Sequence, residues 1–132
     1  MRKQKVYRDN RDTLQKVSVS FKQLRKSGIY TRMNFWDCQS CGYAAMDGEL
    51  KKEAEKGRKY TGCAFYHNQD NDMFKETGEL MIAFSDVDEN FDSTGEEKQR
   101  AVGEKISDIL RQNGLKAEWD GETSHRIKVM SA

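Results

Sequence analysis

The sequence contains no proline among its 132 residues, only three cysteines, and no long apolar run. Without proline, it cannot build a site that relies on a cis-proline or on a Pro-Cys-x-x-Cys motif. An odd number of cysteines, with no apolar leader behind the basic N-terminus, is typical of a reducing compartment rather than of a disulfide framework. No segment approaches the roughly 20 apolar residues that span a bilayer. We therefore expect a cytoplasmic protein with no membrane segment.

The charged residues, 34 % of the chain, are unevenly distributed. Residues 1–32 hold ten Lys and Arg against two Asp, a net charge of +8, and the remaining residues carry −7. Such asymmetry is typical of a basic arm that binds nucleic acid or another polyanion. The alternative is that the basic segment lies against the protein's own acidic body. We expect residues 1–10 to form a basic N-terminal arm and residues 11–132 a single domain.

Hydrophobic periodicity predicts helices and strands in the order ααββαββ. The third helix starts at a capping box, Thr94 to Glu97, and we expect residues 69–77 to be a connection that includes one helical turn. The fold class is therefore α+β, with one mixed or mainly antiparallel sheet of about four strands packed by two to three helices. The expected segments are helices at 10–26, 43–55 and 94–113, and strands at 60–67, 79–85, 115–119 and 126–129.

The most informative motif is Cys38-Gln-Ser-Cys41-Gly42, which we place in a loop or turn. Two thiolates three positions apart grip one metal ion, and the glycine lets the backbone fold so that its amides face the sulfurs. The motif is half of a zinc site. The alternative is a pair of reduced thiols beneath the aromatic stretch that holds Phe35 and Trp36.

Zinc takes about four ligands, so two must come from elsewhere, and the candidates are Cys63, His67, Asp70 and His125. Cys63 and His67 lie four positions apart on a predicted strand, about 13 Å from each other, so both reach one ion only if the strand bulges. His67 ends the strand and is the better ligand, which leaves Cys63 as a small core residue. We predict a zinc site of Cys38, Cys41 and His67, with Asp70 or a water as the fourth ligand.

Three other chemistries are poorly supported by the spacing. Trp36 stands one residue too far from Cys38 for a thioredoxin active site, which also needs a preceding strand and a cis-proline. A zinc deaminase needs a His-x-Glu ahead of its cysteines, and His67-Asn-Gln69 follows them and lacks the acid. A calcium loop over residues 86–97 has Phe91 where the sharp bend requires glycine, which favours a solvated acidic turn.

Several motifs together resemble a family of uncharacterised bacterial domains of unknown function, over residues 34–129. The resemblance implies no reaction, and it directs attention to Cys38, Cys41, His67, Gln69, Asp70 and Asp120. The motifs are Cys38-x-x-Cys41-Gly42, Gly62-x-Ala64-Phe65-Tyr66-His67-x-Gln69-Asp70, Leu80-x-Ile82-Ala83-Phe84, Val102-Gly103, Gly114-Leu115-x-x-Glu118-Trp119-Asp120-Gly121 and Arg126-Ile127-x-Val129.

These observations favour a small cytoplasmic binding module with a structural zinc site, whose partner is a protein or a nucleic acid. Its small, charged, proline-free format suits a phage or mobile-element protein that disables a host factor. The alternative is a metal-dependent hydrolase with an open zinc-water position and Asp70 or Asp120 as general base. Nucleic acid would bind through residues 1–32. The expected binding residues are Trp36, Gln69, Lys16, Lys22, Arg25 and Lys26.

Overall fold

The computed structural model describes residues 2–88 and 95–131, and side chains from Asn10 onward. Within these residues the fold is α+β, with four helices and one mixed five-stranded sheet, so the predicted class is confirmed, with one strand and one helix more than expected. The elements are α1 (Arg2–Lys26), β1 (Ile29–Arg32), α2 (Gln39–Glu55), β2 (Gly62–Phe65), α3 (Asn68–Thr77), β3 (Leu80–Asp86), α4 (Glu96–Gln112), β4 (Leu115–Glu118) and β5 (Ile127–Ser131).

The strands are ordered β1-β2-β3-β5-β4 across the sheet. β1 and β2 are parallel, with Ile29 paired to Gly62, and every other neighbouring pair is antiparallel. Parallel neighbours need a crossover, and α2 provides it. The start of α2 therefore follows directly on the loop that leaves β1.

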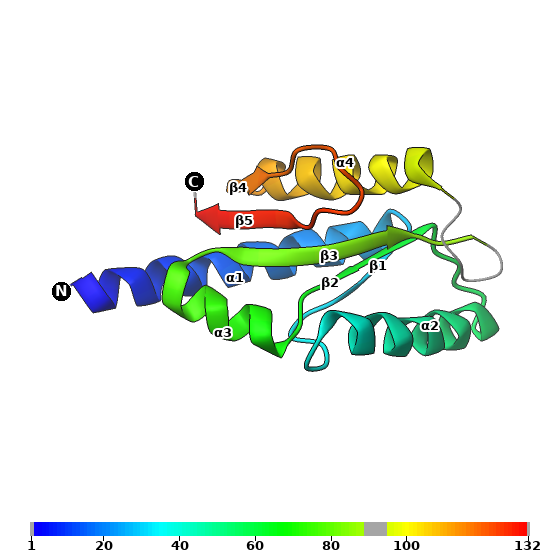
Figure 1. Cartoon of the computed structure of the whole chain (residues 1–132), viewed down its shortest axis with the longest axis horizontal. Coiled ribbons are helices and arrows are strands. Elements are labelled where there is room, and N and C mark those ends of the chain that lie inside the picture. Colours follow the sequence, from blue (N-terminus) through cyan, green and yellow to red (C-terminus); the bar gives the residue numbers. More distant parts are fainter. Residues whose placement is uncertain (1, 89–94, 132) are drawn as a thin grey trace.

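Each face of the sheet carries its own apolar core, and helices lie against both faces (Figure 1). α1 and α4 contact each other and cover one face, where Val17, Leu24 and Ile106 are fully buried. α2 covers the β1–β2 part of the other face through Met46 and Leu50. Leu, Ile and Val recur on α1 and α4 at the spacing that buries one stripe of each helix, and the buried residues of α2, Gly42, Met46 and Leu50, recur every four positions.

Two glycines allow helices to approach the sheet closely. A Cβ on Gly42 would lie 2.3 Å from the ring of Phe65, and one on Gly103 would lie 2.6 Å from the ring of Trp119. Both distances are far below van der Waals contact, so only glycine fits. Gly42 thereby seats the first turn of α2 on β2.

The structure corrects several predicted boundaries. α1 begins at Arg2, so the helix predicted over residues 10–26 also includes residues 2–9 of the predicted basic arm. Residues 68–77 form α3 instead of a connection, and Ile29–Arg32 adds β1. α2 begins at Gln39, so the cysteine motif starts a helix rather than lying in a loop. The predicted capping residue Thr94 lies outside the described residues. In the described part of the chain, Gly95 is the N-cap of α4.

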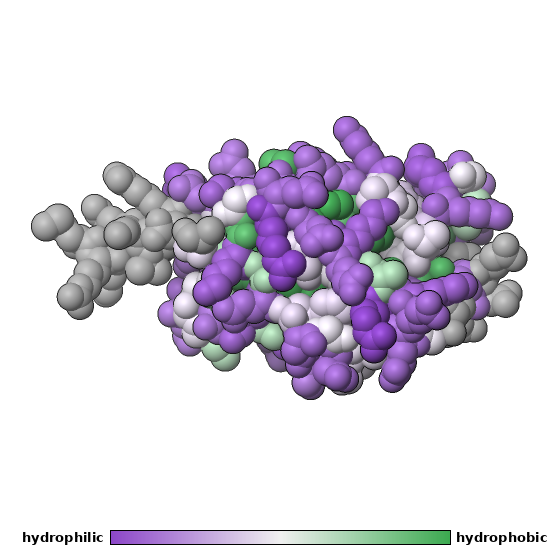
Figure 2. Space-filling model, turned by 90° about the horizontal axis from the view of Figure 1, so that it is seen from above, coloured by the Kyte–Doolittle hydropathy of each residue, from purple (hydrophilic) through white to green (hydrophobic). Residues whose placement is uncertain are grey.

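Hydrophilic side chains cover most of the described surface seen in Figure 2, and apolar ones appear there in small separate patches. Among the side chains that the structure describes, the exposed large apolar ones are Val19, Trp36 and Met73. Within residues 2–88 and 95–131, no helix is both long and apolar enough to cross a membrane.

Candidate functional site

The loop of residues 33–38, here called the Trp36 loop, joins β1 to α2 with a strained backbone. Asn34 has φ 51° and Trp36 has φ 64°, in the left-handed region that a bulky side chain rarely adopts. Phe35 is buried, whereas the side chain of Trp36 is 55 % exposed. The chain therefore turns one aromatic ring into the core and holds the next in solvent.

Hydrogen bonds to the segment after β2 fix this conformation. The amide of Phe35 donates to the carbonyl of Tyr66 at 2.8 Å, and the amide of Asn68 donates to the carbonyl of Trp36 at 2.8 Å. The side chain of Asn68 also donates to Asp37 at 2.7 Å. The strain is thus held by residues about thirty positions later in the chain.

The two cysteines occupy the first turn of α2. Cys38 is the N-cap, and its sulfur accepts a hydrogen bond from the amide of Cys41 at 3.4 Å. The hydroxyl of Ser40 lies 3.5 Å from the same sulfur. Cys38 is half-buried and Cys41 is exposed, so both thiols are within reach of solvent.

These contacts separate the acidities of the three thiols. The pKa of Cys38 is lowered to about 7, chiefly by a hydrogen bond from the Cys41 thiol and then by the one from Ser40. The pKa of Cys41 is raised, because it donates to Cys38 and lies beside its charge. Burial raises the pKa of Cys63 to about 12. Cys38 is therefore the thiol that ionises most readily.

His67 caps the helix that follows it. It is the N-cap of α3, its Nδ1 accepts from the amide of Asp70 at 3.3 Å, and its own amide donates to Oδ2 of Asp70 at 3.1 Å. A ring whose Nδ1 accepts carries its proton on Nε2, and Nε2 lies 3.2 Å from Oδ2 of Asp70. Both ring nitrogens are therefore already engaged with Asp70.

Asp70 has a further partner that the sequence did not reveal. Its Oδ1 accepts from the guanidinium of Arg126 at 2.7 Å, and the side chain of Asp70 is only 6 % exposed. The carboxylate thus joins the start of α3 to the segment before β5. Its two oxygens serve Arg126 and His67, so the predicted hydrolase base is engaged in structural contacts.

The predicted zinc ligands do not meet at one point. Among the residues that the structure describes, no three His, Cys, Asp or Glu side chains are grouped so that they could hold a metal ion. Cys63 is 2 % exposed in the core under α2, which confirms its prediction as a core residue. The donor set of Cys38, Cys41, His67 and Asp70 therefore does not fit a four-ligand zinc site in this conformation, and zinc binding stays a prediction.

Asp120 forms a second histidine–carboxylate pair on the loop between β4 and β5. Its Oδ2 lies 2.6 Å from Nδ1 of His125, and both side chains are exposed. The amide of Glu122 and then His125 lower the pKa of Asp120. His125 lies at the rim of a cleft of about 390 Å³ that also includes Gln39 and Tyr43 of α2. The next residue in the chain, Arg126, contacts Asp70.

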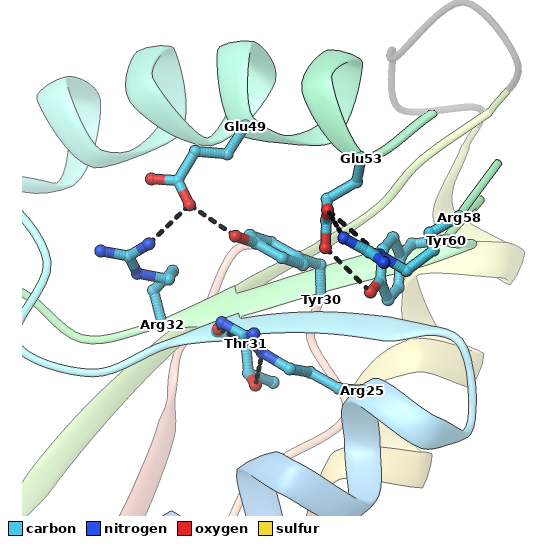
Figure 3. A network of polar contacts seen from close by, with 8 residues as sticks. All are labelled: Arg25, Tyr30, Thr31, Arg32, Glu49, Glu53, Arg58 and Tyr60. Atoms are coloured by element: carbon cyan, nitrogen blue, oxygen red, sulfur yellow. Dashed lines mark hydrogen bonds and ion pairs between the residues drawn. The ribbon is translucent and has the colours of Figure 1, made fainter. Parts of the chain in front are cut away.

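The predicted basic surface is only partly available. Lys16, Lys22 and Lys26 are exposed, but Arg25 donates to the carbonyl of Thr31 and lies over the ring of Tyr30 (Figure 3). The same view shows Glu49 of α2 accepting from Tyr30 and Arg32 of β1. The contacts of Glu49 hold α2 over β1. Two basic side chains of residues 1–32, Arg25 and Arg32, are therefore engaged within the chain.

Two other predicted features lie at the surface. Gln69 is exposed in the first turn of α3, close in sequence to Asn68, which contacts the Trp36 loop. The acidic segment that we compared with a calcium loop includes Asn90 and Asp92, which lie outside the described residues. Asp86 ends β3 and is buried.

Comparison with known proteins gives a family without an assigned activity. The family described as "Domain of unknown function (DUF6891)" matches residues 1–132, the whole sequence. The chain belongs to this family. No curated protein and no solved structure matches it. Function in this DUF6891 member must therefore be argued from its own site.

Proposed function

We propose that this chain is a small cytoplasmic binding module that recognises a protein partner through the Trp36 loop. The observation that carries the proposal is Trp36 itself, 55 % exposed on left-handed backbone. Such a backbone costs roughly 1–3 kcal/mol, and an exposed indole gives up roughly 2 kcal/mol of burial. Both costs are expected where a side chain binds a partner. Tryptophan is enriched among the residues that contribute most of the binding energy at protein interfaces.

The charges near the loop favour a protein over a nucleic acid. Asp37 lies within the loop itself, next to Trp36. Lys22, Arg25 and Arg32 line a groove of about 220 Å³ together with Met33, the first residue of the loop. Arg25 and Arg32 are already engaged with Thr31 and Glu49 in the chain, which leaves mixed charge rather than a continuous basic track. A protein surface with an apolar pocket and nearby carboxylates suits this arrangement.

The sequence-based hypothesis also includes a cytoplasmic location, a zinc ion and a phage-like origin. The cysteines are free thiols, which supports a cytoplasmic location. Zinc bound by Cys38 and Cys41 would stiffen the start of α2, but recognition by Trp36 does not depend on it. The phage-like origin rests on the format of the sequence alone.

The test compares Trp36→Ala with Met73→Ala, because both side chains are 55 % exposed. The immobilised full chain is used to isolate a partner from extracts of the cells that encode it, and the purified partner is then titrated against each variant. We expect Trp36→Ala to raise Kd at least about tenfold and Met73→Ala to change it by less than about twofold. Equal affinity of the two variants would contradict the proposal.

Nucleic acid is the competing outcome of the same experiment. If it is the partner, affinity for an oligonucleotide falls steeply with salt and depends on Lys16, Lys22 and Lys26 rather than on Trp36. Salt-insensitive binding that needs Trp36 supports the protein partner.

A further inference from the structure

The Trp36 loop ends at the thiol of Cys38, and a second thiol, that of Cys41, lies in the first turn of α2. Cys38 and Cys41 lie one helical turn apart at the N-terminus of α2, where the amide of Cys41 donates to the sulfur of Cys38. Both thiols are accessible, and Cys38 follows the exposed Trp36 by two positions. A protein bound to Trp36 would therefore lie next to the dithiol.

We infer that Cys38 and Cys41 form a redox-active dithiol that exchanges with a disulfide carried by the bound partner. The inference deepens the proposed function and rests on it for the choice of substrate, a protein disulfide. The exchange itself depends only on the two sulfurs and the donors around them.

The geometry assigns different roles to the two sulfurs. Cys38 caps the helix, and the Cys41 amide and the Ser40 hydroxyl face its sulfur, so a negative charge there is stabilised by donors and by the helix terminus. Cys38 is therefore the attacking residue. Cys41 lies in the first turn of α2, one helical turn from Cys38, and is placed to attack the Cys38 sulfur afterwards, so it is the resolving residue.

The exchange is balanced in atoms and electrons. The Cys38 thiolate attacks one sulfur of the substrate disulfide, the substrate S–S bond breaks, and its other sulfur leaves as a thiolate that takes a proton from water. Cys41 then loses its proton to water and attacks the Cys38 sulfur, which breaks the mixed disulfide and releases the second substrate thiolate. The substrate gains two electrons, and the pair becomes the Cys38–Cys41 disulfide.

This dithiol is built on a different frame from that of thioredoxin. The strand before the motif, β1, lies at the edge of the sheet, and the sequence contains no proline to supply a cis-proline beside the thiols. The residue packed against the first turn of α2 is Phe65, over Gly42. Absence of a thioredoxin fold therefore argues against that family and not against the chemistry of the pair.

The test uses the full chain with glutathione as the disulfide, in the presence of a chelator, and reads intact mass after acid quenching. Cys63, which is buried, is the internal control. We expect the wild-type chain to form one intrachain disulfide as the proportion of oxidised glutathione rises. Cys41→Ser should trap glutathione on Cys38, with about tenfold more adduct than Cys38→Ser shows on Cys41.

Two results would overturn the inference: no intrachain disulfide at any glutathione ratio, or equal adducts on the two variants. Circular dichroism checks that both variants are folded. The assay needs no protein partner and leaves Trp36 in place, so its failure is distinct from failure of the proposed function. If the disulfide forms but Trp36→Ala binds the partner normally, the dithiol stands and the docking site is wrong.

Discussion

Arg126 contacts Asp70 across the start of α3, with a guanidinium nitrogen 2.7 Å from Oδ1, and the carboxylate is 6 % exposed. The same carboxylate accepts from the amide of His67. The two residues are 56 positions apart, so this pair ties the middle of the chain to its last strand. The polar cluster after β2 therefore has a structural role: the Asp70–Arg126 pair is a joint between the start of α3 and the segment before β5.

The first prediction concerns this joint. Arg126→Met removes the partner of a buried carboxylate, and we expect it to lower the free energy of unfolding by about 2 kcal/mol. Lys128→Met is the control, because it breaks an exposed pair with Glu79 at 3.6 Å and should cost less than about 0.5 kcal/mol. Urea denaturation measures both. Equal losses would contradict a special role for the buried pair.

The second prediction separates capping from metal binding. His67→Ala removes the N-cap of α3 and should cost about 1 kcal/mol, whereas Gln69→Ala, at an exposed position, should cost less than about 0.5 kcal/mol. Because both nitrogens of His67 face Asp70, we expect His67→Ala to leave the metal content per chain unchanged. Elemental analysis of the reduced chain measures it. Zinc that is present in the wild type and lost in this variant would show that the ring turns to a metal ion.

The elements with regular apolar spacing were predicted well, and those with unusual caps were not. α4 follows from its apolar stripe, and β3 follows from its continuous apolar run between polar turns. The N-caps of α2 and α3 are Cys38 and His67, and neither residue type belongs to the Ser, Thr, Asp and Asn set that marks a helix start in a sequence. Because neither helix start was recognised in the sequence, the cysteines were predicted to lie in a loop and α3 was not predicted. β1 is buried at three successive positions, so it lacks the alternation that marks β4, which is equally short.

The candidate site depended on contacts that no local pattern contains. Cys38 and Cys41 were found from their spacing, and Cys63 was correctly placed in the core. The left-handed backbone of Trp36 has no sequence signal, because it is imposed by hydrogen bonds to Tyr66 and Asn68 from the far end of β2. Arg126 was missed for the same reason.

The third prediction is a pH profile for thiol alkylation. Because the pKa of Cys38 is lowered to about 7, its rate of reaction with iodoacetamide should rise about tenfold between pH 6 and pH 8 and then level off as the thiolate saturates. Cys41→Ala removes the largest cause of the lowered pKa and should move the midpoint of Cys38 upward, and Ser40→Ala should move it less. Peptide mass spectrometry follows each cysteine. A midpoint that stays in place in Cys41→Ala would contradict the assigned donor.

The fourth prediction tests the close approach that seats the dithiol on the sheet. A Cβ on Gly42 would lie 2.3 Å from the ring of Phe65, whereas one on Gly48, in the same helix, has no atom within 4 Å. Gly42→Ala should therefore lower the free energy of unfolding by about 2 kcal/mol, since α2 or the ring must shift. Gly48→Ala should raise it by up to about 1 kcal/mol through helix propensity alone. Denaturation measures both. Because the shift would displace the first turn, Gly42→Ala should also slow alkylation of Cys38, and an unchanged rate would show that the dithiol does not depend on this packing.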